Sequence, residues 1–182
     1  FSYRGNMILS KNIRKNLILI GMPASGKSTI GVLLAKVTNR NFMDSDIVIQ
    51  DTTGKLLREL IADHGPDGFS EIENRINSQI DCDNTVIATG GSAIFGKDAM
   101  KHFSKIGTII YLRVDHDSLM QRIGDLDERG VVHLPGETLL DIMKKREPLY
   151  EKYADIVVDE PTGIFSVDDI LNTVIKTINS GE

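Results

Sequence analysis

The clearest chemical signal in the chain is at residues 21–28, which read GMPASGKS and match the phosphate-binding pattern G-x-x-x-x-G-K-[ST]. The glycines of such a loop let the backbone approach phosphate oxygens that a Cβ would push away. Lys27 can reach the β- and γ-phosphates of a nucleotide, and the Ser28 hydroxyl can bind Mg²⁺. The pattern predicts nucleotide contacts from Gly21, Ala24, Ser25, Gly26, Lys27, Ser28 and Thr29.

Two carboxylates, Asp44 and Asp46, come directly after a short apolar run. Beside a magnesium nucleotide, one carboxylate can hold the metal or its water while the other orients an acceptor hydroxyl and takes its proton. The alternative is that Asp46 serves only as the N-cap of a helix, a position that aspartate favours. Because the phosphate loop lies upstream, the catalytic interpretation is the stronger one.

A glycine pair, Gly90-Gly91, precedes Ser92 and follows another apolar run. Paired glycines at the end of a strand let the backbone approach a ligand closely and expose N–H donors. A plain turn is the alternative. We therefore expect this loop to contact a ligand.

Three arginines complete the set of candidate residues. Arg122 and Arg129 flank a polar loop at about 124–136, long enough to act as a mobile lid that excludes water and stabilises transferred charge. Arg146 lies in the segment KREPLY and could present its guanidinium to a substrate carboxylate. A solvated salt bridge is the alternative for Arg122 and Arg129, and a surface arginine on a helix is the alternative for Arg146.

Strand-like apolar runs alternate with helical patterns along the chain. Strands are expected at 17–20, 41–43, 85–88, 108–112 and 155–158. Helices are expected at 27–38, 46–52, 55–63, 69–81, 97–103, 116–123, 137–152 and 167–179. This alternation predicts an α/β fold of three layers, with a five-stranded, mostly parallel sheet and helices on both faces. Ligands of such folds bind beyond the carboxyl ends of the strands, where all the candidate loops lie.

Composition narrows the function further. The 182 residues carry a net charge of −5 and no long basic run, so we expect no nucleic-acid or anionic-membrane surface and no obligate protein partner. A single cysteine and no long apolar segment favour the cytoplasm. The four histidines lack metal-ligand spacing. We expect one domain over 7–182 and treat 1–6, which precede Met7, as a cloning remnant or a disordered leader.

Taken together and in this order, the motifs resemble the shikimate kinase family, over about 17–158. The resemblance implies a P-loop kinase fold and transfer of a phosphoryl group from ATP, with Mg²⁺, to a hydroxyl of shikimate in aromatic amino-acid biosynthesis. It makes Asp44 a helper of the magnesium shell and Asp46 the residue on the acceptor hydroxyl. It places Gly90, Gly91 and Ser92 in the acceptor pocket and Arg146 on the acceptor carboxylate. Lys27 and the lid residue Arg129 would stabilise the transferred charge, and Arg122 would lie towards adenine.

The chain departs from the family pattern mainly on the acceptor side. Ser70 stands where the family places a second carboxylate-binding arginine, and Pro66 replaces a glutamate. Ser92 replaces the last residue of a triple glycine, and the lid reads RGVV in place of RPLL. Losing an arginine from a desolvated carboxylate pocket costs about 2–5 kcal/mol of binding. Another cation could compensate, and the candidates are Arg58, Arg75 and Lys97.

Alternatives remain open at this point. The altered pocket could serve another small hydroxy acid or an amino acid such as homoserine, with Arg146 binding the carboxylate and Glu73 the ammonium group. A nucleotide-binding module without catalysis is a second alternative, although Asp46 and Arg129 argue against it. A GTPase-like switch lacks its Asn-Lys-x-Asp motif, and a nucleoside monophosphate kinase fits the acceptor motifs less well.

Overall fold

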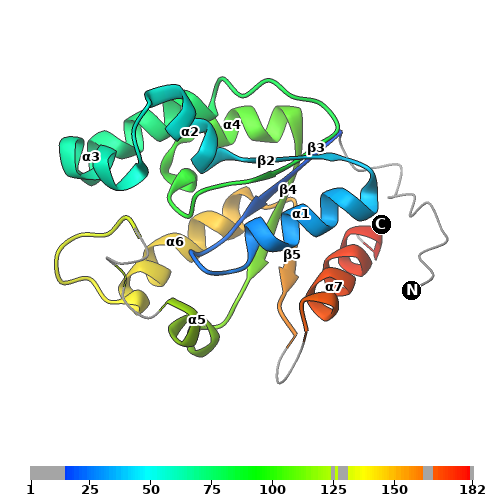
Figure 1. The fold of residues 1–182 in the computed structure, drawn as a ribbon. Helices are drawn as coiled ribbons and strands as arrows, with labels where there is room; N and C mark the ends of the chain where they lie inside the picture. The colour runs from blue at the N-terminus through cyan, green and yellow to red at the C-terminus, as the bar shows by residue number, and fades with distance from the viewer. Residues whose placement is uncertain (1–14, 124–125, 127–130, 162–165, 181–182) are drawn as a thin grey trace.

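Five short strands form one parallel sheet in the computed structural model, which describes residues 15–123, 126, 131–161 and 166–180 (Figure 1). The strands are β1 (Asn16–Ile20), β2 (Asn41–Asp44), β3 (Thr85–Ala88), β4 (Gly107–Arg113) and β5 (Ile156–Asp159). Their order in the sheet is β2-β3-β1-β4-β5, and every pairing is parallel. The predicted fold class is confirmed, and all four recorded pairings are parallel where the sequence predicted a mostly parallel sheet.

Helices cover both faces of this sheet. They are α1 (Lys27–Thr38), α2 (Ser45–Thr53), α3 (Leu57–Asn77), α4 (Lys97–Ile106), α5 (His116–Ile123), α6 (Leu139–Tyr153) and α7 (Val167–Ser180), with a 3₁₀ turn η1 (Ala93–Phe95). Helices α1 and α7 pack on one face and α4 and α6 on the other (Figure 1). None of the helices in the described part of the chain combines the length and apolar character that crossing a membrane requires.

The central strand β1 shows how the sequence produces three layers. Its five residues are all buried, and successive side chains point to opposite faces. Leu17 and Leu19 join the core under α1 and α7, whereas Ile18 and Ile20 join the core under α4 and α6. An apolar run without polar interruptions is therefore what this doubly covered strand needs.

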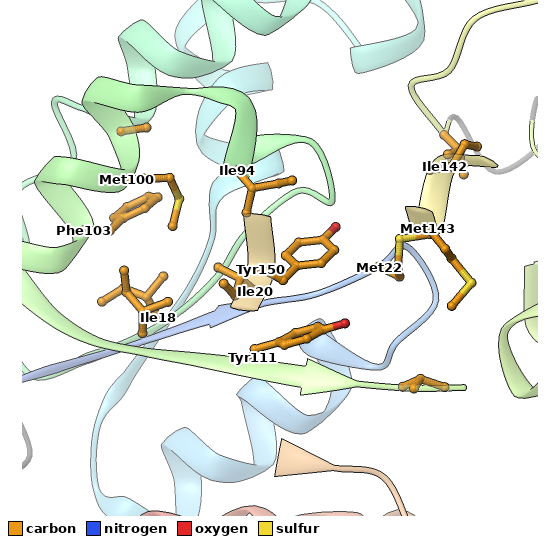
Figure 2. Close-up of a cluster of buried hydrophobic side chains, with 14 of the residues drawn as sticks. Ile18, Ile20, Met22, Ile94, Met100, Phe103, Tyr111, Ile142, Met143 and Tyr150 are labelled. Carbon is orange, nitrogen blue, oxygen red and sulfur yellow. The ribbon is translucent and has the colours of Figure 1, made fainter. Parts of the chain in front are cut away.

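The core under α4 and α6 also anchors the loop that follows β1. Met22, in that loop, lies beside Met143 of α6, and the ring of Tyr150 stacks on Tyr111 of β4 (Figure 2). The two ring centroids are 4.9 Å apart. Packing thus fixes α6 against both the sheet and the phosphate-binding loop, and this helix carries Arg146.

Helix α3 consists of two helical segments that meet at a kink. At Gly65 the backbone has φ 70° and ψ 175°, which is not helical, so the element Leu57–Asn77 divides there into the two helices that the sequence predicted at 55–63 and 69–81. Pro66 lacks an N–H and disfavours helical backbone at the residue before it, which explains the break. The second helix ends at Asn77 and not at 81. The bend lies between Leu60 and Phe69, which both join a small core with Ile49 of α2.

Candidate functional site

The phosphate-binding loop joins β1 to α1 as the sequence predicted. Gly26 is the N-cap of α1 and has φ 86°, a conformation that side chains with a Cβ rarely adopt. The Nζ atom of Lys27 donates hydrogen bonds to the carbonyls of Gly21 at 2.9 Å and Met22 at 2.8 Å. Burial lowers the pKa of Lys27 to about 8. The loop therefore holds a buried lysine next to backbone that is shaped to bind an anion.

Asp44 and Ser28 meet at the end of β2. Ser28 Oγ donates to Asp44 Oδ2 at 2.9 Å, and Asp44 Oδ1 accepts from the backbone N–H of Asp46 at 3.0 Å. Asp44 is thus the N-cap of α2. Because Asp44 fills that role, the alternative in which Asp46 is merely a helix cap is wrong.

Asp46 instead turns its carboxylate towards a cavity of about 360 Å³ at the carboxyl end of the sheet, called here the first cavity. Burial, and then the charge of Asp44, raises the pKa of Asp46 to about 6. At neutral pH this carboxyl group is mostly ionised and can accept a proton. Predicted residues that line the first cavity are Ala24, Gly26, Lys27, Ser28, Thr29, Asp46, Gly90, Gly91, Ser92 and Arg146.

The glycine loop after β3 touches two carboxylates because it lacks side chains. A Cβ on Gly90 would lie 2.7 Å from both Asp46 Oδ1 and Glu73 Oε1. Ser92 Oγ donates to Glu73 Oε2 at 2.7 Å. Glu73 is buried, its Oε1 has no hydrogen-bond partner among the described residues, and burial raises its pKa to about 7.

Arg146 faces the same glycine loop from α6. Its side chain is only 2% exposed, and its Nη1 lies 2.9 Å from where a Cβ on Gly91 would be. Its Nη2 donates to the carbonyl of Val132, and its guanidinium carbon lies 5.7 Å from the centre of the Phe95 ring. No described carboxylate forms an ion pair with Arg146. A surface arginine is therefore the wrong interpretation of this residue.

Arg122 lies apart from the first cavity. Its Nη2 forms an ion pair with Glu160 Oε2 at 2.7 Å, which joins α5 to the loop after β5. The salt bridge that the sequence left as the alternative for Arg122 is therefore present. Gly21, Ser25, Asp44 and Glu73 support the cavity without lining it.

Arg129 and most of the expected lid lie outside the described residues, as does the leader 1–6. From the lid, Val131 and Val132 line the first cavity. The three cations considered as replacements at position 70, Arg58, Arg75 and Lys97, are exposed and line no cavity in the described structure.

The sequence analysis assigned no role to several residues of the site. Ser45 Oγ accepts from the backbone N–H of Gly90 at 3.3 Å, and Tyr150 Oη donates to the carbonyl of Gly91 at 2.6 Å. The sequence offered a signal for each of them. Ser45 lies between two aspartates, and Tyr150 lies one helical turn after Arg146. Thr89, Leu57, Ile61 and Phe69 also line the first cavity, and nothing in their local sequence marks them.

Among the residues that the structure describes, no three of the types His, Cys, Asp and Glu gather in a way that could hold a metal ion. A metal at this site would therefore depend on few protein ligands. The oxygen pair of Ser28 and Asp44 fits Mg²⁺, which keeps several waters and binds one or two protein oxygens together with substrate phosphates.

Known proteins are similar to this chain in sequence and in architecture. A family model described as shikimate kinase matches residues 23–179. A shikimate kinase of Haemophilus influenzae is 35% identical over 171 residues, covering 92% of this chain and 94% of that protein. One of Nitrosococcus oceani is 32% identical over 166 residues, covering 90% and 86%. The structure of the Acinetobacter baumannii shikimate kinase in complex with shikimate matches with a TM-score of 0.79 and 27% identity, covering 91% of this chain and 93% of that one.

Proposed function

Because the chain belongs to the shikimate kinase family, it is an ATP-dependent small-molecule kinase, and we propose how its residues divide the transfer of phosphate to shikimate. The observation that carries the proposal is the position of Asp46. Its carboxylate lies in one cavity between the phosphate-binding loop and the Arg146 side of the pocket. A group in that position can serve both the nucleotide and the acceptor.

The nucleotide half consists of the loop 21–28 and the start of α1. Backbone N–H groups and Lys27 bind the phosphates, and Ser28 and Asp44 hold Mg²⁺ directly or through its waters. When bound, the metal supplies positive charge that neutralises the phosphate oxygens. Arg122, fixed by Glu160, borders the adenine.

Asp46 acts on the acceptor hydroxyl. The hydroxyl oxygen forms a bond to the γ-phosphorus, the bond from that phosphorus to the bridging oxygen of ATP breaks, and ADP leaves. The proton of the hydroxyl passes to the Asp46 carboxylate. Lys27, and Arg129 from the lid, stabilise the negative charge on the transferred group, while the closed lid excludes water.

Arg146 binds the acceptor carboxylate, and the bare backbone of Gly90 and Gly91 lets the acceptor approach. Ser92 and Glu73 support this loop from behind. The first cavity, at about 360 Å³, lies within the size range of pockets for small molecules. The single cysteine fits a reducing compartment, and a cytoplasmic location is part of the proposal.

An assay that follows ADP release from Mg-ATP tests the proposal, with shikimate and homoserine run side by side. Homoserine is included because the unpartnered Glu73 Oε1 could pair with its ammonium group. Shikimate-dependent turnover that disappears in Asp46→Asn supports the assignment. Turnover with homoserine alone would move the acceptor to an amino acid, and ATP binding without turnover on either compound would contradict the catalytic roles.

A further inference from the structure

A second cavity of about 350 Å³ lies beside the first and has no role in the proposed phosphoryl transfer. Ser92, Val132 and Arg146 line both cavities, so one guanidinium borders two separate spaces. The volume suits a small organic molecule. The apolar side chains of its walls and the positive charge of Arg146 indicate which kind of ligand it could bind.

Large apolar side chains from three parts of the chain contribute to the walls. Phe95 from η1, Leu134 from the segment before α6, and Ile142 from α6 all line this second cavity. Phe95 is 43% exposed and Leu134 51% exposed, which is high for large apolar side chains. Exposed apolar groups gathered around a cavity favour a ligand with an apolar body.

The buried charge in the second cavity is positive. Arg146 is almost fully buried and no described carboxylate pairs with it, which favours an anionic partner. Glu137 also lines this cavity, but Lys145 pairs with its Oε1 and the Leu134 N–H donates to its Oε2. Asp67 is exposed at the edge, where water screens it. A monocarboxylate would give Arg146 the anion that it lacks.

Ser70 borders the second cavity from α3. It lines the second cavity and not the first, and its side chain is among the smallest that could stand there. A larger side chain at this position of α3 would project into the second cavity. The departure from the family pattern at Ser70 therefore falls on this cavity.

We propose that the second cavity binds a small monocarboxylate with an aromatic body, with its carboxylate on Arg146 and its ring against Phe95, Leu134 and Ile142. The inference rests on the proposed function only in one respect, that Arg146 also binds the acceptor. Such a ligand shares the charge of Arg146 with the acceptor carboxylate. Its binding therefore weakens acceptor binding and raises the KM for shikimate.

Titration calorimetry of the full chain, without nucleotide or acceptor, tests the proposal with phenylacetate as the probe. We expect 1:1 binding with a Kd of about 1 mM or tighter. The isosteric but uncharged phenylacetamide should bind at least ~10-fold more weakly, since it cannot form a charge-assisted pair with Arg146. Acetate, which lacks the ring, should show no measurable binding.

Two variants locate the probe. Phe95→Ala removes one wall and Ser70→Leu fills the space from α3, and each should weaken phenylacetate binding by ~10-fold. The matched control is Leu140→Ala, because Leu140 is also on α6, is 45% exposed and lines neither cavity. Thermal unfolding of each variant shows whether it is folded.

Absence of phenylacetate binding at ~10 mM overturns the proposal. So does equal binding of phenylacetamide, or unchanged binding in both Phe95→Ala and Ser70→Leu, because the probe would then lie elsewhere, for example in the first cavity. Because these measurements need no turnover, they stand or fall separately from the kinase assay. Inhibition of shikimate turnover by phenylacetate in the native chain, reduced in Ser70→Leu, would link the two cavities through Arg146.

Discussion

The nucleotide side and the acceptor side of the first cavity are built in different ways. On the nucleotide side, one continuous segment at 21–29 supplies most of the predicted contacts, while Asp44 and Arg122 come from β2 and α5. On the acceptor side, Asp46, Glu73, Gly90 and Arg146 come from four separate elements. The first arrangement depends on local backbone shape, and the second depends on how distant helices pack.

This contrast has an energetic consequence. A phosphate-binding loop relies on backbone N–H groups and glycine conformations, which leave few side chains free to vary. The acceptor side relies on the buried Arg146, the buried Glu73 and the partly buried Asp46, and the pKa values of both carboxyl groups are raised. A single substitution changes the balance of these charges. Specificity should therefore respond to substitution more readily than nucleotide binding does.

Asp46→Asn is expected to have the largest effect, because Asp46 serves both sides. We expect kcat to fall by about 10²–10⁴-fold, the usual contribution of a general base, while the affinity for ATP stays within a few fold. Steady-state kinetics and ATP binding by calorimetry measure the two quantities. A large loss of ATP affinity would show that the two sides are not separable at this residue.

Arg146→Ala tests the acceptor side alone. We expect the KM for shikimate to rise by about 30- to several-thousand-fold, since removing a buried partner of a carboxylate costs about 2–5 kcal/mol. The KM for ATP should stay close to that of the native chain. Lys144→Ala is the matched control, because this lysine lies on the same helix but is exposed. An equal rise in both KM values would contradict the separation.

The same contrast explains which features the sequence predicted. The phosphate loop, the strands and the fold class follow from local patterns, and the predicted 27–38 and 116–123 helices match α1 and α5 to the residue. The pairing of Ser28 with Asp44 was predictable because both follow strands of one parallel sheet. The break at Gly65 separates the two predicted helices of α3, as a glycine before a proline favours, although the second helix ends at Asn77 and not at 81.

Features that depend on packing were not predictable. Nothing in the local sequence shows that Tyr150 reaches the carbonyl of Gly91, or that Glu73 keeps an oxygen without a partner. The second cavity likewise requires that η1, α3 and α6 come together beside Arg146. Ser70 could be singled out from the sequence, but the cavity that it borders could not.

Ser70→Arg should strengthen the binding of shikimate on the acceptor side and leave the nucleotide side unchanged. A guanidinium there would lie one helical turn before Glu73, whose Oε1 lacks a partner, and next to Arg146. We expect the KM for shikimate to fall by ~10-fold, about 1.4 kcal/mol, with the KM for ATP unchanged. Ser70→Gln, which extends the side chain and keeps a hydrogen-bond donor without the charge, is the control. A fall in KM in both variants would indicate packing as the cause, and no fall in either would show that Arg146 alone saturates the carboxylate.

Glu73→Gln is expected to have the smallest effect. It tests whether ionisation of a buried carboxyl group on the acceptor side lowers the free energy of unfolding. Because burial raises the pKa of both Glu73 and Asp46, these groups bind protons more tightly in the folded chain than in the unfolded one. The stability that they contribute is therefore present below about pH 4 and is lost as the pH rises to about 7.

Glutamine keeps an acceptor for Ser92 but cannot ionise. The difference between the Tm of the variant and that of the native chain should therefore be more positive at pH 8 than at pH 5. Each kcal/mol of difference corresponds to about 2–4 °C in a chain of this size. A difference in Tm that does not change with pH would mean that Glu73 does not titrate in this range, and the cost of the acceptor side would then rest on Asp46 alone.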